Sequence, residues 1–248
     1  MQWLHDIAAA LLNLDILERY GWRMIAGLGL TIELVAISCS IGFVLALLIA
    51  HARLSRSRTL SALAYGYTIF FRGTPLLCQR CLVYYGIGQF LPAWRDWLIG
   101  AGLWSFFRDA FFWVTLTFTL NTAAYQAEAL RGAIQSVPQG QVEAAKALGL
   151  PALGILRAVV WPQALLIALR PLGNELISMI KASSVASLAT LFDLMGATRL
   201  AFARSFDLAV YLYAALLYLA LVEIIRRLWG VLERRLSRRT GANSPGAC

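Results

Sequence analysis

The long uncharged stretches of this chain restrict its fold more than any other feature. Residues 26–50 contain one charged side chain, Glu33, and a bilayer-crossing helix needs about 20 mostly apolar residues. Only 14% of the 248 residues are charged, whereas a soluble domain carries about 25%. This composition excludes a disordered chain, a secreted disulfide scaffold and an ordinary water-soluble enzyme. It predicts an all-α membrane protein.

Four further apolar runs cover residues 58–91, 106–130, 158–180 and 208–229, so the sequence predicts five transmembrane helices. The run over 58–91 is too long for one straight span. It is interrupted by Arg72, Gly73, Thr74 and Pro75, which combine a flexible residue with one that lacks an N–H. We therefore expect the second span to be a broken or kinked helix.

The distribution of positive charge predicts the orientation of the spans. Twelve Lys and Arg residues lie after the first span, between the third and fourth spans and from Arg226 to the end of the chain, against six in the opposite segments. Positively charged segments favour the cytoplasmic side, which places the N-terminus outside and the C-terminus inside. The net charge of +9 is then an orientation signal and does not indicate nucleic-acid binding. We expect an outer segment over 1–25, a membrane domain over 26–230 and a basic, partly disordered cytoplasmic tail over 231–248.

The segment over 131–162, between the third and fourth spans, has its own helix signals. Ser136 and Gln139 fit a capping box around Pro138, and strong helix formers follow until Gly149 and Pro151. We expect a short cytoplasmic helix over about 138–150. Two interpretations are open: its small residues offer a surface to a partner's groove, or the helix shields its own bundle.

This segment resembles the EAA loop of ABC-importer permeases. The resemblance starts with Glu143, Ala144, Ala145 and Gly149 and continues to Pro162, which follows Trp161 where the family pattern has Leu. Other segments resemble the polar amino-acid branch, the histidine/lysine/arginine/ornithine type. They are Phe71–Leu76, Leu120–Tyr125, Arg131–Pro138 and Pro171–Leu176.

The resemblance implies the type I ABC-importer (MetI-like) permease fold in the bacterial inner membrane, with a periplasmic N-terminus. It implies three kinds of partner: a dimer of ATP-binding subunits, a second permease subunit and a periplasmic solute-binding protein. Glu143, Ala144, Ala145, Gly149 and Pro162 would then couple the ATPase to the spans. The implied solute is a basic or polar amino acid or a conjugate such as an opine.

The chain lacks the Gly-x-x-x-x-Gly-Lys-Ser/Thr pattern that cradles ATP phosphates, so we expect ATP and Mg on the partner ATPase and no cofactor here. The chain is accordingly expected to be a transport subunit and not an enzyme. Cys78 and Cys81 form one isolated pair without a nearby histidine. We interpret them as two buried apolar thiols and predict no metal site.

Polar side chains inside the spans are costly and need a reason. Two stripes are spaced i, i+4 and i+7: Asn121, Tyr125 and Glu128 in the third span, and Asn174, Ser178 and Lys181 in the fourth, with Glu175 beside the second stripe. One interpretation is that the stripes face each other across the translocation path and contact an amino acid. The other is that they hydrogen-bond neighbouring helices.

Two arginines complete the set of candidate residues. We expect Arg72 to shape the helix break by hydrogen-bonding freed carbonyls. Arg80 occupies a position where the family usually has an apolar residue. It binds a solute carboxylate or pairs with a glutamate of the partner permease, and both interpretations are open.

Two other functions compete with a permease subunit. An intramembrane enzyme needs a catalytic constellation within spans, and no predicted span contains a histidine or a Gly-x-Ser-x-Gly. A channel or secondary transporter built on inverted repeats needs two equal halves, which five spans do not give.

Overall fold

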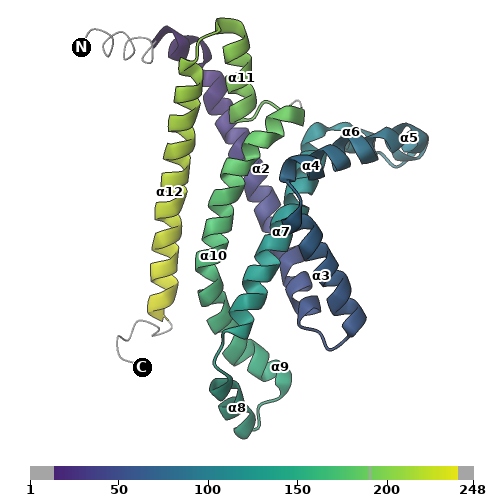
Figure 1. Cartoon of the computed structure of the whole chain (residues 1–248), viewed down its shortest axis with the longest axis vertical. Helices are drawn as coiled ribbons and strands as arrows, with labels where there is room; N and C mark the ends of the chain where they lie inside the picture. Colours follow the sequence, from purple (N-terminus) through teal and green to yellow (C-terminus); the bar gives the residue numbers. More distant parts are fainter. Residues whose placement is uncertain (1–13, 190, 240–248) are drawn as a thin grey trace. The chain divides into compact units, whose positions relative to one another are not determined.

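The computed structural model describes residues 14–189 and 191–239, and all regular structure in these ranges is helical. The α-helices are α2 (Leu14–Arg53), α3 (Arg58–Gly73), α4 (Leu76–Cys81), α5 (Leu91–Gly100), α6 (Trp104–Arg108), α7 (Ala110–Gln135), α8 (Gln139–Ala147), α9 (Ala152–Ile155), α10 (Trp161–Ala182), α11 (Leu194–Ser205) and α12 (Ala209–Arg239) (Figure 1). Two π-helical segments, η1 (Leu82–Ile87) and η3 (Leu156–Val160), and two 3-10 segments, η2 (Gly88–Phe90) and η4 (Ser183–Ala189), complete the order.

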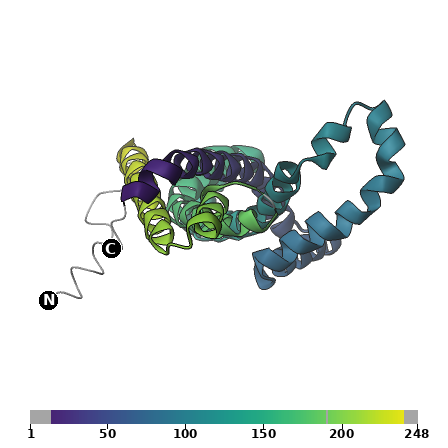
Figure 2. The same ribbon diagram turned by 90° about the horizontal axis from the view of Figure 1, so that it is seen from above.

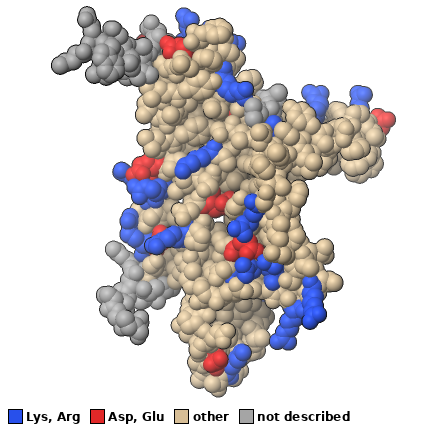
Figure 3. Space-filling model, in the orientation of Figure 1, with Lys and Arg blue, Asp and Glu red and all other residues tan. Residues whose placement is uncertain are grey.

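Three helical stretches in the described part of the chain are long and apolar enough to cross a membrane. They are Ile16–Arg53, Ala152–Ser187 and Ala209–Ser237. They contain the first and fourth predicted spans and all but the first residue of the fifth. Neutral side chains cover most of the face in Figure 3, as expected for a surface that meets lipid. The second and third predicted spans correspond to the broken run from α3 to η1 and to α7.

One predicted boundary was wrong. The third span was predicted to begin at residue 106, but α6 ends at Arg108 and α7 begins at Ala110. Asp109 between them is extended, and its Oδ1 accepts a hydrogen bond of 2.9 Å from the Phe111 N–H. At the other end, α12 continues to Arg239, so the described part of the predicted tail is helical. Residues 1–13 of the predicted outer segment and 240–248 of the tail lie outside the described residues.

The chain divides into two compact units. The first comprises Met1–Cys39, Thr74–Thr119 and Ser178–Glu223. Its apolar core joins the start of α2 to α11 and α12 through buried side chains such as Met24, Leu194 and Val210. The Thr31 hydroxyl donates to the Gly27 carbonyl at 3.1 Å and accepts the Leu194 N–H at 3.2 Å. This hydroxyl therefore links α2 to the start of α11.

The second unit comprises Ser40–Gly73, Leu120–Ile177 and Ile224–Cys248. Its core is rich in fully buried alanines from three helices: Ala46 and Ala50 of α2, Ala127 of α7, and Ala164 and Ala168 of α10. Small side chains let helix backbones approach closely, which is how helices associate in membranes. The same core extends into the loop that carries α8.

The predicted helix break at residues 72–75 is confirmed. Helix α3 ends at Gly73, and extended Pro75 (φ −62°, ψ 136°) precedes α4. The buried Gln79 amide donates to the Thr74 carbonyl at 3.0 Å and to the Thr74 hydroxyl at 2.7 Å. Beyond α4 the chain changes to π and 3-10 geometry before α5, and Figure 2 shows these short segments following one another in a curve.

Candidate functional site

Helix α8 begins as predicted near residue 138, but not by the predicted capping box. Pro138 is the N-cap and provides no side-chain cap. The Ser136 hydroxyl donates instead to the Ala133 carbonyl at 2.8 Å, because Ser136 directly follows α7 and binds back to its last turn. The capping-box prediction was therefore wrong.

The end of α8 is confirmed as predicted. Gly149 has a φ of +75°, the left-handed conformation that glycine adopts without strain. Its N–H donates to the Lys146 carbonyl at 2.9 Å, and the Leu150 N–H donates to the Ala145 carbonyl at 3.2 Å. This pair of bonds is the Schellman motif that closes a helix and releases the chain toward α9.

Helix α8 has one buried and one exposed face. Ala145 is 5% exposed and packs into the core of the second unit with Val137, Ile155 and Val160. Glu143, Ala144 and Gly149 are exposed, and Leu148 is 81% exposed. The two interpretations of this helix each describe one face, since α8 packs on its own chain and also presents an apolar side chain outward.

The start of α10 is tied to α8. The side-chain amide of Gln163 donates to the Val159 carbonyl at 3.0 Å and to the Gln141 side-chain oxygen. The neighbouring Trp161 lies with its ring centre 5.4 Å from that of His51, at the end of α2. Trp161, the departure from the EAA pattern, thus has a ring partner in this chain, and Pro162 beside it is exposed.

Donors from α7 satisfy carbonyls at the helix break. The Asn121 amide donates to the Phe71 carbonyl at 3.1 Å, and the Tyr125 hydroxyl lies 3.4 Å from the Arg72 carbonyl. In the opposite direction, the Tyr67 hydroxyl of α3 donates to the Leu120 carbonyl of α7 at 2.6 Å. Arg72 was predicted to satisfy such carbonyls, whereas these donors come from the first predicted stripe.

A polar cluster surrounds this junction. The Arg72 guanidinium lies 5.4 Å from the centre of the Tyr125 ring, and the Thr122 hydroxyl donates to Glu175 Oε1 at 3.1 Å. Thr122, which sequence reasoning missed, is thus the α7 residue that contacts Glu175. The i, i+4 and i+7 spacing that defines the first stripe includes its neighbour Asn121 and leaves Thr122 out. Arg72 and Tyr125 are exposed, so the cluster is open on one side.

The second stripe has a different environment from the first. Asn174, Ser178 and Lys181 lie on the exposed surface of α10. Asn121 is 6% exposed and hydrogen-bonded to α3, so it belongs to the helix packing. Asn121 therefore has the kind of contact that the second interpretation describes, whereas Tyr125 of the same stripe is exposed at the polar cluster.

Glu128 belongs to an ion-pair cluster. Its carboxylate lies 3.0 Å from Arg53 Nε and 2.7 Å from Arg131 Nη2. The Arg53 guanidinium also lies 4.5 Å from the centre of the Tyr65 ring. The cluster ties the end of α2 to α7, and two cations already neutralise Glu128.

Arg80 and the nearby cysteines lie on and beside α4. Arg80 is 2% exposed, and its Nη2 lies 3.6 Å from Cys81 Sγ. Cys78 is exposed and Cys81 half-buried, so the prediction of two buried thiols was wrong. The reason is that α4 turns its Cys78 side outward and its Gln79 and Arg80 sides inward.

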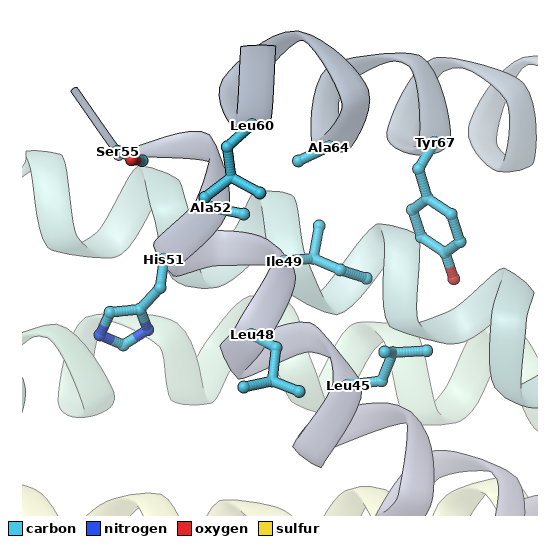
Figure 4. A pocket seen from close by; sticks show the side chains of 9 residues that line it. All are labelled: Leu45, Leu48, Ile49, His51, Ala52, Ser55, Leu60, Ala64 and Tyr67. Atoms are coloured by element: carbon cyan, nitrogen blue, oxygen red, sulfur yellow. The ribbon is translucent and has the colours of Figure 1, made fainter. Parts of the chain in front are cut away.

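An apolar groove of about 570 Å³ lies between α2 and α3 in the second unit. Figure 4 shows its lining side chains. They are Leu45, Leu48, Ile49, His51, Ala52, Ser55, Leu60, Ala64 and Tyr67. His51 Nδ1 is 2.8 Å from the Leu47 carbonyl and the Tyr67 hydroxyl is bonded to α7, so two of the few polar groups here are engaged elsewhere.

Comparison with known proteins gives consistent matches. Residues 42–238 match the family described as binding-protein-dependent transport system inner membrane component. The nopaline transport system permease protein of Agrobacterium fabrum is 39% identical over 231 residues, 91% of this chain and 94% of that protein. An octopine transport system permease protein of Rhizobium radiobacter is 40% identical (85% and 84% covered). The histidine/lysine/arginine/ornithine transport system permease protein of Escherichia coli K12 is 34% identical (94% of each).

Solved structures agree with these matches. The structure of an amino acid ABC transporter with histidines superposes with a TM-score of 0.76 at 31% identity, over 88% of this chain and 96% of that one. An inward-facing structure of the methionine ABC transporter MetNI shares the fold, with a TM-score of 0.66 at 20% identity over 88% and 98%.

Proposed function

Because this chain belongs to the binding-protein-dependent transport system inner membrane components, as a permease subunit of an amino-acid or opine ABC importer, we propose that α8 couples a separate ATPase to its spans. The observation that carries the proposal is the two-sided burial of α8. Ala145 anchors the helix in its own unit, whereas Glu143, Ala144 and Leu148 face outward. A contact made on the exposed face is transmitted through the buried one.

Membership of this family favours a permease subunit over an intramembrane enzyme and over a secondary transporter. We propose five transmembrane helices in the bacterial inner membrane, formed by α2, the broken run from α3 to η1, α7, α10 and α12. The N-terminus is then periplasmic and the C-terminus cytoplasmic, from the charge distribution. The membrane domain spans residues 26–230.

The proposed assembly has three kinds of partner: a dimer of ATP-binding subunits that holds ATP and Mg, a second permease subunit, and a periplasmic solute-binding protein. When the ATPase dimer closes, it moves α8, and the Gln141 to Gln163 contact carries this movement to the start of α10. Two residues set the conformation of the loop around α8. Gly149 ends the helix, and Pro162 lies exposed beside the Gln141 to Gln163 contact. The ATPase biases alternating access because it contacts α8 differently in its two states.

We propose that the solute is a basic or polar amino acid or an opine, because nopaline, octopine and histidine, lysine, arginine or ornithine are the solutes named for three similar permeases. Tyr125 and Glu175, at the polar cluster, and Asn174 and Ser178, exposed on α10, are the proposed solute contacts. Asn121 and Glu128 hold the helices around that path, through the hydrogen bond to Phe71 and the ion pairs with Arg53 and Arg131.

The coupling proposal is tested by Glu143→Gln and Gly149→Val in the complete importer. Glu143→Gln removes an exposed charge, and Gly149→Val places a branched side chain at φ +75°, which costs on the order of 1–2 kcal/mol. Apart from its chain neighbours, no described residue has an atom within 4 Å of a Cβ added at Gly149, so the effect falls on the helix end and the docking partner.

We expect both variants to separate ATP hydrolysis from uptake, with uptake reduced at least about tenfold while hydrolysis by the ATPase continues. The matched control is Gly140→Ala on the same helix, where an added methyl also meets nothing within 4 Å among the non-neighbouring residues that the structure describes and φ is not positive. It should leave uptake unchanged. If uptake and assembly survive both test substitutions, α8 is not the coupling element.

A further inference from the structure

Arg80 is a buried cation whose donors are largely unused. It is 2% exposed, and its Nε and Nη1 have no hydrogen-bond partner among the described residues. Its Nη2 contacts only a weak acceptor, Cys81 Sγ, at 3.6 Å. None of the ion pairs in the described part of the chain includes it.

The neighbouring Gln79, in contrast, is a buried polar residue whose side-chain amide is hydrogen-bonded. It is equally buried at 2% exposed, and its amide donates to both oxygens of Thr74 at the helix break. Arginine stays charged in proteins, and an unpaired charge in a low-dielectric interior is strongly unfavourable. Arg80 therefore needs an anion that this conformation does not provide.

The burial of Arg80 restricts where that anion comes from. A lipid headgroup or a glutamate of a second permease subunit approaches from the surface of the chain, and the surface of α4 is formed by Leu77 and Cys78. Arg80 points into its own chain. The anion must consequently enter the interior, as a transported solute does.

The backbone around Arg80 favours the same conclusion. Helix α4 is six residues long and lies between the break at Pro75 and the π-helical segment η1. Irregular backbone at membrane depth is tolerated where it is buried in protein or lines a water-filled cavity, and π-helical turns are frequent at functional sites. Arg80 thus lies in an irregular segment of the kind that membrane proteins bury in protein or place along a water-filled cavity.

We propose that Arg80 binds a carboxylate of the transported solute when the interior opens during the transport cycle. This inference rests on the proposed function, since it needs a solute that passes through the chain. A carboxylate is common to amino acids and their conjugates, and a guanidinium is the side chain best suited to pair with it. The test distinguishes the carboxylate of the amino-acid head from a second one carried by a conjugate.

The test uses the complete importer in proteoliposomes, with radiolabelled L-arginine, which has one carboxylate, and octopine, which has two. Arg80→Met removes the charge at similar length, and Arg80→Lys keeps it. Arg95→Met is the matched control, because Arg95 is exposed on α5. We expect Arg80→Met to reduce uptake of at least one probe about tenfold or more, as for loss of one charged hydrogen bond.

The thermal stability of the purified complex separates binding from a structural role. If Arg80 is unpaired at rest, Arg80→Met leaves the melting temperature unchanged or raises it while uptake falls. Arg80→Lys should retain more uptake than Arg80→Met, and Arg95→Met should match the wild type. A loss with both probes assigns Arg80 to the carboxylate of the amino-acid head, and a loss with octopine alone assigns it to the second carboxylate.

Unchanged uptake of both probes in Arg80→Met would overturn the inference. A melting temperature that falls together with uptake would overturn it too, because it identifies Arg80 as a structural residue. If the wild-type importer takes up neither probe, the proposed solute class fails and the inference fails with it. The coupling test on α8 is independent of that result.

Discussion

Asp193 shows how a single side chain can start a helix at an energetic cost. It is fully buried, and its Oδ1 accepts the Gly196 N–H at 3.0 Å, which caps α11. Its Oδ2 has no hydrogen-bond partner within the described ranges. Burial raises the pKa of Asp193 to about 6, although the hydrogen bond from Gly196 acts in the opposite direction.

The raised pKa predicts a pH dependence of stability. The native carboxyl keeps its proton up to about pH 6, whereas the unfolded one loses it near the ordinary aspartate pKa of 3.8. Between these values the native state binds more protons, so the free energy of unfolding falls as pH rises, by up to about 3 kcal/mol. Asp193→Asn keeps a cap without a charge, and its melting temperature should vary less between pH 4 and 6 and be higher at pH 7.

The measurement is the melting temperature of the purified protein in detergent from pH 4 to 7.5. Asp193→Ala is the control, since it removes the cap and should lower the melting temperature throughout. An Asp193→Asn variant with the same slope as the wild type would show that another group titrates in this window.

At the scale of elements, α10 and α12 meet at a glycine. The Trp229 indole N–H donates to the Leu169 carbonyl at 2.8 Å, and its ring covers Gly173 one turn further along α10. A Cβ at Gly173 would overlap this indole. The absence of a side chain at residue 173 is therefore what lets the two helices pack at this point.

Gly173→Ala should destabilise the protein by about 1–3 kcal/mol, because the indole must move and lose its hydrogen bond. Thermal unfolding in detergent checks this as a lowered melting temperature. Gly230→Ala, next to Trp229, adds the same methyl where no atom of the described, non-neighbouring residues lies within 4 Å, and it should be neutral or slightly stabilising. Equal melting temperatures for the two variants would contradict the packing described for α10 and α12.

Local signals explain which elements could be predicted from the sequence. The break at Gly73 to Pro75 and the helix end at Gly149 depend on the residues' own conformational limits, so both could be found. The break at Asp109 has neither glycine nor proline, and it depends on one side-chain hydrogen bond to Phe111. Such a bond is visible only in the structure.

At the scale of the whole molecule, apolar runs and ordered motifs were enough to predict an all-helical membrane permease. The candidate solute residues were harder, because their roles depend on neighbours distant in sequence. Asn121 turned out to donate to Phe71, Glu128 to pair with Arg53, and Thr122 to contact Glu175. A spacing of i and i+4 identifies a face of a helix and not the helix that it meets.

Uptake in cells that contain or lack this chain tests its role most directly. The other importer subunits are kept, and radiolabelled basic amino acids and opines are supplied one at a time. We expect uptake of at least one of these solutes to be lost without the chain, restored by the wild-type chain and not restored by Gly149→Val. Uptake of every solute at the wild-type rate without the chain would contradict its function as the permease subunit.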